Sequence, residues 1–262
     1  MVKFVAKQPV NPAALEAFEF LLDPFSATLG DKDGSHFTAE SGDVRIEVTG
    51  SGFKYALNEL LPTGTVTRVK VFLSDQIAYD LKNAAIDVGD LVTASSVESA
   101  FKKVFKGKDK FVGSSGDDEF ATGGKSDKLD GKSGDDKLHG DGGKDKLDGG
   151  DGSDELDGGG GKDTYVFKDA PGSGIDTITN FQSGEKLKIS MSVFDGLSKG
   201  KLVDGAFVDG TEAQDSDDRF IYDSSTGKLY HDADGVGGQA QVQFALLQPG
   251  LSNFGAENII IV

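Results

Sequence analysis

The stretch from Gly113 to Val166 reads GSSGDDEFA, TGGKSDKLD, GKSGDDKLH, GDGGKDKLD, GGDGSDELD and GGGGKDTYV, so the chain repeats itself every nine residues. The sixth position of each unit is always an aspartate: Asp118, Asp127, Asp136, Asp145, Asp154 and Asp163. The eighth position is always large and apolar: Phe120, Leu129, Leu138, Leu147, Leu156 and Tyr165. A fixed short period predicts a repeat architecture, in which each unit packs on its neighbours.

Each unit predicts a glycine-rich turn followed by a strand of about three residues. Ordering a residue costs roughly 1–2 kcal/mol of backbone entropy, so one inward apolar residue per unit cannot stabilise the turns alone. Glycine lets the turns expose their carbonyl groups, and the aspartates add anionic oxygens. These are the ligands of Ca²⁺, which takes about 6–8 oxygens. The repeat therefore predicts bound calcium.

The units at 149–157 and 158–166 match GGxGxDxUx at every fixed position, and the repeat resembles the nonapeptide of the RTX (repeats-in-toxin) calcium-binding proteins. The resemblance implies a parallel β-roll in which two units make one coil, so that aspartates one coil apart face one ion. Carried over by position, it implies the pairs Asp109/Asp127, Asp118/Asp136, Asp127/Asp145, Asp136/Asp154, Asp145/Asp163 and Asp154/Asp176. These eight aspartates are the implied ligands of several Ca²⁺ ions.

Two pairs extend the roll beyond the regular units. Gly107, Asp109 and Phe111 fall in phase with positions four, six and eight, which gives a leading turn at 104–112. After Val166 the phase slips by a four-residue insertion, and the segment 172–181 then restores the pattern around Asp176. In the family such a block closes the roll.

Stacked aspartates make the roll dependent on metal. Neighbouring strands lie about 4.8 Å apart. Two carboxylates at roughly 5 Å repel by about 0.8 kcal/mol in water and about 3 kcal/mol at an effective dielectric near 20. The unit at 122–130 departs from the consensus, because Thr122 and Lys125 replace glycines, and Lys132 and Asp141 replace the second glycine of later units. Non-glycine residues at positive φ cost roughly 1 kcal/mol or more. We expect weaker sites at the turn 122–127.

Residues 1–105 predict a separate domain that contains helices and strands. Apolar and polar residues alternate at 44–48 and along 66–73, which predicts two strands. The segment 13–22 carries apolar residues on one helical face, Ser74 can cap a second helix to about Ala85, and residues 99–105 predict a short third helix.

The chain after residue 182 reads as β structure with glycine turns. RFIYD (219–223) and KLYHD (228–232) predict a hairpin, and QVQFALL (241–247) predicts a further strand. The ending AENIIIV resembles the C-terminal part of secreted RTX proteins, where an acidic residue followed by apolar residues lies within an uncleaved signal for type I secretion. Glu257 and Ile259–Val262 fit that form. The resemblance implies a type I exporter as partner and an extracellular location.

Together these segments predict a mainly β protein. A parallel β-roll of nonapeptide repeats (106–182) lies between a small α+β N-terminal domain of unassigned role (1–105) and a β-rich C-terminal cap (183–262). The first twenty residues lack an uninterrupted apolar segment, so we expect no cleaved N-terminal signal peptide. No apolar stretch approaches the ~18 residues of a membrane-spanning helix.

Composition excludes several classes of function. With 44 acidic against 27 basic residues the net charge is −17, which disfavours nucleic acid as a partner because phosphate binding needs clustered Lys and Arg. The sequence has no cysteine, so it forms neither disulfides nor thiolate metal sites. None of the histidines His36, His139 and His231 lies in an HExxH motif, which excludes the zinc metalloprotease class.

The residues select no catalytic site. Gly196–Gly200 matches the GxSxG pattern, but that motif has meaning only between a strand and a helix of an α/β-hydrolase sheet. We therefore predict a secreted calcium-binding protein whose roll folds on binding extracellular Ca²⁺. One alternative is an extracellular enzyme in which residues 1–105 or 180–250 act on a polysaccharide. The other is an adhesin or a membrane-interacting RTX protein that binds a cell surface.

Overall fold

A computed structural model describes residues 107–262 with their side chains and, before them, the backbone of six strands. The chain divides into two compact units, Met1–Ser115 and Gly116–Val262. Within the described residues no helix is long and apolar enough to cross a membrane.

The unit Met1–Ser115 contains a mostly antiparallel sheet. Its strands are β1 (Lys3–Ala6), β2 (Thr28–Lys32), β3 (His36–Ser41), β4 (Val44–Ala56), β5 (Glu59–Leu73), β6 (Gln76–Asp87) and β7 (Lys110–Val112). Strands β2 to β6 pair antiparallel in chain order, and β1 pairs antiparallel with β6 and parallel with β7.

The sequence predictions for this unit have mixed outcomes. The strands predicted at 44–48 and 66–73 are confirmed as parts of β4 and β5. The helix predicted from Ser74 to about Ala85 is wrong, because this segment forms β6. Ile77, Tyr79 and Leu81 are large apolar residues at every second position, a period-2 pattern that suits a strand between β5 and β1. The helices predicted at 13–22 and 99–105 lie outside the described residues.

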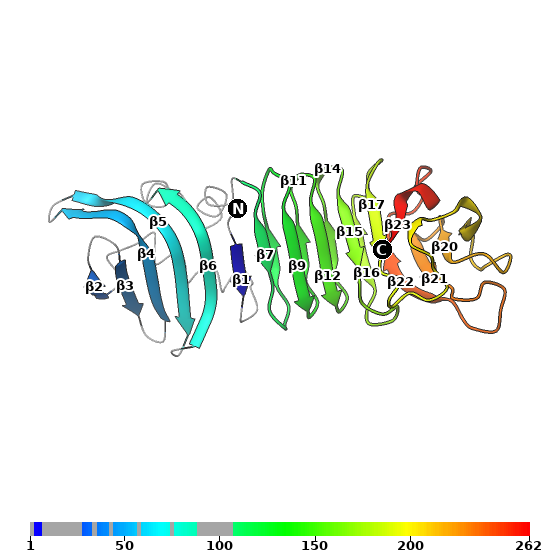
Figure 1. Cartoon of the computed structure of the whole chain (residues 1–262), viewed down its shortest axis with the longest axis horizontal. Coiled ribbons are helices and arrows are strands. Elements are labelled where there is room, and N and C mark those ends of the chain that lie inside the picture. The colour runs from blue at the N-terminus through cyan, green and yellow to red at the C-terminus, as the bar shows by residue number, and fades with distance from the viewer. Residues whose placement is uncertain are drawn as a thin grey trace. The chain divides into compact units, whose positions relative to one another are not determined.

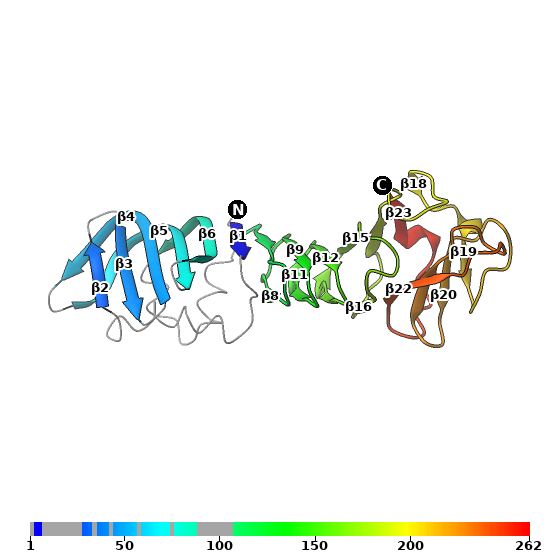
Figure 2. The same cartoon turned by 90° about the horizontal axis from the view of Figure 1, so that it is seen from below.

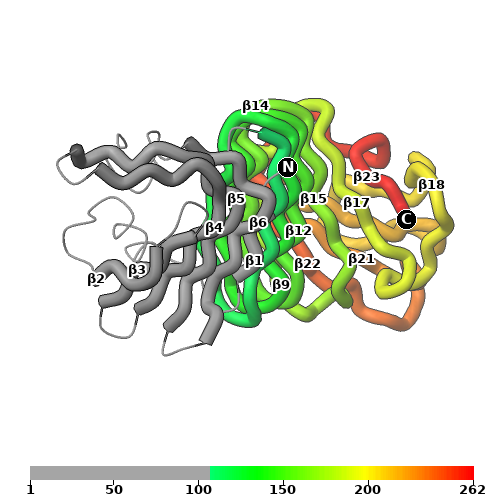
Figure 3. The backbone as a smooth tube through the Cα atoms, turned by 60° about the vertical axis from the view of Figure 1, so that its left-hand side comes forward, coloured from blue at the N-terminus to red at the C-terminus, as the bar shows by residue number. Residues whose placement is uncertain are grey.

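The unit Gly116–Val262 begins with two parallel sheets to which successive repeat units contribute in turn. One sheet stacks β8 (Glu119–Ala121), β10 (Lys137–His139), β13 (Glu155–Asp157) and β16 (Asp176–Thr179). The other stacks β9 (Lys128–Ser133), β12 (Lys146–Asp151), β15 (Thr164–Phe167) and β17 (Lys186–Ile189). Figures 1 and 2 show the two rows of strands, and Figure 3 shows the chain winding through them as successive coils.

The register places like positions of the repeat on top of one another. Leu138 lies beside Phe120 on one neighbouring strand and beside Leu156 on the other. Every position-eight side chain is buried between the sheets: Phe120, Leu129, Leu138, Leu147, Leu156 and Tyr165. The predicted two-unit coil and the parallel β-roll are thus confirmed, and the predicted return of the pattern after the insertion is confirmed by β16.

The C-terminal part extends both sheets of the roll. The strand β22 (Val242–Leu246) adds parallel to β16, and β23 (Ile259–Ile261) adds parallel to β17. The hairpin of β20 (Phe220–Asp223) and β21 (Lys228–His231) is confirmed and pairs with β22. The short elements are β11 (Gly142–Gly143), β14 (Gly160–Gly161), β18 (Gly200–Lys201), β19 (Phe207–Asp209) and the 3-10 turns η2 (Asp204–Ala206) and η3 (Ala256–Asn258).

Candidate metal centre

The position-six aspartates form two columns, one beside each sheet. The first column contains Asp118, Asp136, Asp154 and Asp176, and the second contains Asp127, Asp145 and Asp163. In each neighbouring pair the backbone N–H of the earlier aspartate donates to Oδ1 of the later one. The N···O distances are 2.7 Å for Asp118/Asp136 and Asp127/Asp145, 2.8 Å for Asp136/Asp154 and Asp145/Asp163, and 3.2 Å for Asp154/Asp176.

The structure therefore brings together five of the six predicted pairs. Asp109 is also buried, with 1% of its surface exposed, but it belongs to the unit Met1–Ser115. Its pairing with Asp127 stays a prediction.

The second carboxylate oxygen, Oδ2, of several column aspartates is buried without a hydrogen-bond donor in the described part of the chain. Oδ2 of Asp136, Asp145, Asp154 and Asp163 is buried and receives no hydrogen bond from any described residue. Each of these side chains is at most 2% exposed. Because a buried anionic oxygen without a donor is costly, a cation is the group that such oxygens fit.

Backbone carbonyl groups converge on the same oxygens. A Cβ atom at Gly140, the first residue of its unit, would lie 2.6 Å from Oδ2 of Asp145 and 2.9 Å from the carbonyl oxygen of Gly158. The equivalent position at Gly131 is flanked in the same way by Oδ2 of Asp136 and the carbonyl of Gly149. The missing side chain thus leaves room in which a carboxylate and a carbonyl oxygen approach each other.

Burial and like charge raise the pKa values of four aspartates in the columns. Burial, together with neighbouring carboxylates, raises the pKa of Asp136 to about 8 and that of Asp145 to about 7. Burial is also the main reason that the pKa of Asp154 rises to about 6 and that of Asp176 to about 8. At neutral pH without metal, the columns therefore resist being fully ionised in the folded state.

These residues fit calcium. Within residues 107–262 no three His, Cys, Asp or Glu side chains gather into a metal-binding group, so each site has a pair of carboxylates at most. The remaining ligands would be carbonyl oxygens of the glycine turns, a combination that suits Ca²⁺ and not the transition metals. When bound, Ca²⁺ would supply positive charge that compensates the stacked aspartates.

The irregular unit at 122–130 differs from the others where the sequence departs from the consensus. Thr122 is buried at the position that Gly131 and Gly140 hold in later units, and its Oγ1 donates to the carbonyl of Gly140 at 3.3 Å. Its hydroxyl group thus uses a carbonyl that the glycine turns otherwise leave available. Lys125 does not adopt positive φ, unlike Lys132 (φ 92) and Asp141 (φ 60). The predicted weakness of this turn stays a prediction, and the Thr122 contact supports it.

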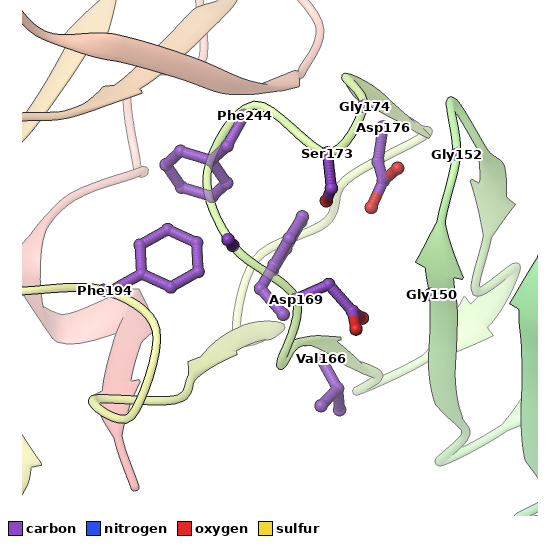
Figure 4. A pocket seen from close by; sticks show the side chains of 11 residues that line it. Gly150, Gly152, Val166, Asp169, Ser173, Gly174, Asp176, Phe194 and Phe244 are labelled. Carbon is purple, nitrogen blue, oxygen red and sulfur yellow. The ribbon is translucent and has the colours of Figure 1, made fainter.

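A small pocket lies beside the end of the first column. It is lined by residues that include Asp169 from the insertion, Ser173 and Asp176 from the segment after it, and Gly150 and Gly152 from the preceding coil. Figure 4 shows the carboxylates of Asp169 and Asp176 on the same side of the pocket as these glycines. The insertion therefore keeps an acidic side chain next to the last glycine turn of this column.

The sequence analysis missed one acidic residue of the second column. Lys186 pairs with Thr164, so the preceding residue Glu185 occupies the coil position that follows Asp163. Glu185 is fully buried. Its signal was the segment Glu185-Lys186-Leu187, which repeats the acid-x-apolar spacing of Asp145-Lys146-Leu147.

The structure describes the surroundings of His139, His231 and the GxSxG segment, and the side chain of His36 lies outside the described residues. His139 lies 3.8 Å from the Asp157 carboxylate at the surface. His231 is buried against Phe194, and its Nε2 lies 2.9 Å from the carbonyl of Asp195. The segment 196–200 leads into the strand β18, which is followed by the short 3-10 turn η2 and not by an α-helix.

Comparison with known proteins agrees with this geometry. A sequence model of the RTX calcium-binding nonapeptide repeat, which represents four copies, matches residues 112–147 and again 130–165. Residues 112–165 are thus RTX nonapeptide repeats, and they form a parallel β-roll. These are calcium-binding repeats, and they contain the aspartates of the two columns except Asp176.

Several solved structures match the chain. One of them, the solution structure of the AlgE6R3 subunit from the Azotobacter vinelandii mannuronan C5-epimerase, is 24% identical, with a TM-score of 0.32. The similarity covers 59% of the present chain and 78% of that one. No curated protein matches the chain significantly.

Proposed function

We propose that this RTX protein is secreted and folds its roll when it meets extracellular Ca²⁺. The observation that carries the proposal is the pair of buried aspartate columns, in which Oδ2 of Asp136, Asp145, Asp154 and Asp163 has no donor among the described residues. A divalent cation between neighbouring coils removes the repulsion that otherwise opposes stacking.

Calcium concentration decides whether the roll is stable. If each site has a Kd of about 10⁻⁴ M, roughly millimolar Ca²⁺ adds about 1.4 kcal/mol per site, or about 7 kcal/mol over five independent sites. Domains are stable by only about 5–15 kcal/mol, so this contribution is comparable to the whole stability. At sub-micromolar calcium the same contribution is close to zero.

The C-terminal strand supports export before folding. Ile259 and Ile261, two apolar residues of the proposed secretion signal, are at most 1% exposed because β23 packs beside β17. A type I exporter that recognises these residues has to bind them before the roll and its cap form. A chain that stays unfolded in low cytosolic calcium meets that requirement.

Far-UV circular dichroism of the full chain tests the proposal. We expect β structure to appear with 1 mM CaCl₂ and to disappear after a chelator, with Mg²⁺ at the same concentration as the control. Mg²⁺ is expected to fail, because it demands near-ideal octahedral geometry and dehydrates reluctantly. A roll that is equally ordered with calcium and with chelator would reject the proposal.

The extracellular partner stays a prediction. A polysaccharide or a cell surface fits a secreted protein, and the enzymatic alternative would also require residues 1–105 or 180–250 to act on such a substrate. An activity screen on secreted polysaccharides with the full chain in calcium separates binding from turnover.

A further inference from the structure

We propose that Glu185 is a metal ligand, and that with Asp163 it forms a terminal Ca²⁺ site that closes the second aspartate column. This inference rests on the proposed calcium-dependent roll. It adds a site outside the nonapeptide repeats, at a position that the nine-residue pattern does not include.

The backbone carries the coil geometry through to Glu185. The N–H of Lys186 donates to the carbonyl of Asp163 at 3.0 Å, as the N–H of Thr164 donates to the carbonyl of Asp145 at 2.9 Å. Residues one position before these donors therefore stack on one another, and Glu185 stacks on Asp163 as Asp163 stacks on Asp145. The insertion after Phe167 changes the spacing along the chain but not the stacking.

Both carboxylates have a buried oxygen that no described donor reaches. Glu185 is 0% exposed and Asp163 is 1% exposed. Oε1 of Glu185 and Oδ2 of Asp163 receive no hydrogen bond within residues 107–262, and the two carboxyl groups lie close enough to interact. The other oxygen of each group is used, since Oδ1 of Asp163 accepts from the N–H of Asp145 at 2.8 Å.

The surroundings fix Glu185 in place without neutralising it. Its Oε2 accepts from the N–H of Gln182 at 2.9 Å and from the Tyr165 hydroxyl at 3.4 Å, and its carbonyl accepts from Nδ2 of Asn258 at 2.9 Å. No Lys, Arg or His side chain of the described residues forms an ion pair with either carboxylate. A site that orients two adjacent carboxylates and provides no positive group is suited to a cation from solution.

A glycine turn lies next to this pair and can complete the ligand set. A Cβ atom at Gly158 would lie 2.6 Å from Oδ2 of Asp163, so this glycine, like Gly140 in an inner site, leaves side-chain-free space beside a column carboxylate. Gln182 also contacts this turn, because its Nε2 donates to the carbonyl of Gly159 at 2.8 Å. The loop that carries Glu185 is thus attached to the turn that would share the ion.

The test compares Glu185→Gln with Glu155→Gln in the full chain. The side chain of Glu155 is 44% exposed and lies 3.9 Å from Lys137, away from the columns, so it controls for the loss of one charge. Equilibrium dialysis with radioactive Ca²⁺ counts bound ions. We expect Glu185→Gln to bind one ion fewer than the parent chain, or to bind one ion at least tenfold more weakly, and Glu155→Gln to match the parent.

The other outcomes are also decisive. If Glu185→Gln binds as many ions as the parent with the same affinity, the carboxyl pair does not hold an ion and the proposed terminal site is wrong. If the parent binds no calcium, the proposed function itself fails. If Glu185→Gln does not fold, Glu185→Asp decides. A ligand role predicts that the shorter acid folds in calcium better than the isosteric amide, and a packing role predicts the reverse.

Discussion

Asp145 lies in the middle of the second column, where one substitution removes a charge from two neighbouring sites. Its Oδ1 accepts from the N–H of Asp127 at 2.7 Å, and its Oδ2 receives no hydrogen bond from the described residues. Asparagine has the same size and keeps an acceptor for that N–H. The substitution Asp145→Asn therefore tests the charge and leaves the packing almost unchanged.

The expected effect changes sign with calcium. In 1 mM Ca²⁺ the variant loses ligands of two sites worth about 1.4 kcal/mol each, so it should be less stable by about 3 kcal/mol. Without calcium, the pKa of Asp145 is raised from 3.8 to about 7 in the folded state. At 1.36 kcal/mol per pKa unit, the Asp145 carboxyl group destabilises the metal-free folded state by roughly 4 kcal/mol at neutral pH. Screening by water reduces this destabilisation to about 2 kcal/mol. The metal-free variant should be more stable by that amount.

Urea unfolding at pH 7.5, followed by far-UV circular dichroism, measures both effects. The metal-free samples contain chelator and the osmolyte TMAO, which favours compact states and brings a weakly stable roll into a measurable range. Asp151→Asn is the matched control, because Asp151 is an exposed residue of the same coil. A variant that is destabilised equally in both conditions would refute the electrostatic reasoning, and so would one that matches the parent in calcium.

Three further predictions follow from the turns and the columns. Gly152→Ala should destabilise the calcium-bound roll by at least about 2 kcal/mol in urea unfolding. The reason is that φ of Gly152 is +133 and a Cβ atom there would overlap a carbonyl of the preceding coil. Gly124→Ala is the control and should change stability little, because a Cβ atom at Gly124 would meet open space. In the presence of chelator, the chain should show more β structure by far-UV circular dichroism near pH 5 than near pH 8. The folded-state pKa values of Asp136 and Asp176 are raised from 3.8 to about 8, so their contribution to stability is present at low pH and is lost as the pH rises through that range. Thr122→Gly should strengthen calcium binding in titration calorimetry by freeing a carbonyl; an unchanged isotherm would contradict this.

The repeat made most of the roll predictable from sequence. Position-six and position-eight residues recur at fixed phase, so the stacking of Leu129 on Leu147 and the pairing of Asp127 with Asp145 follow from counting. The segment 74–87 was not predictable in this way. A capping residue and a run of mixed polarity suit a helix or a strand, and pairing with β5 and β1 decides between them.

The end of the second column was hidden for a different reason. The insertion after Phe167 breaks the nine-residue phase, and the residue that follows Asp163 in the column is a glutamate. A search for aspartates at a nine-residue period therefore does not find Glu185. Only the strand pairing of Thr164 with Lys186 shows that Glu185 belongs to the column.

The alternation of repeat units between two sheets restricts how this protein can grow or shrink. Adding or deleting two whole units lengthens or shortens each column by one member and leaves every later strand on its own sheet. Adding or deleting a single unit would move each later strand to the opposite sheet, so that the column now ending near Asp176 would end near Glu185. Natural length variants of this roll should therefore differ by pairs of units, and designed arrays should be cut and joined in the same steps.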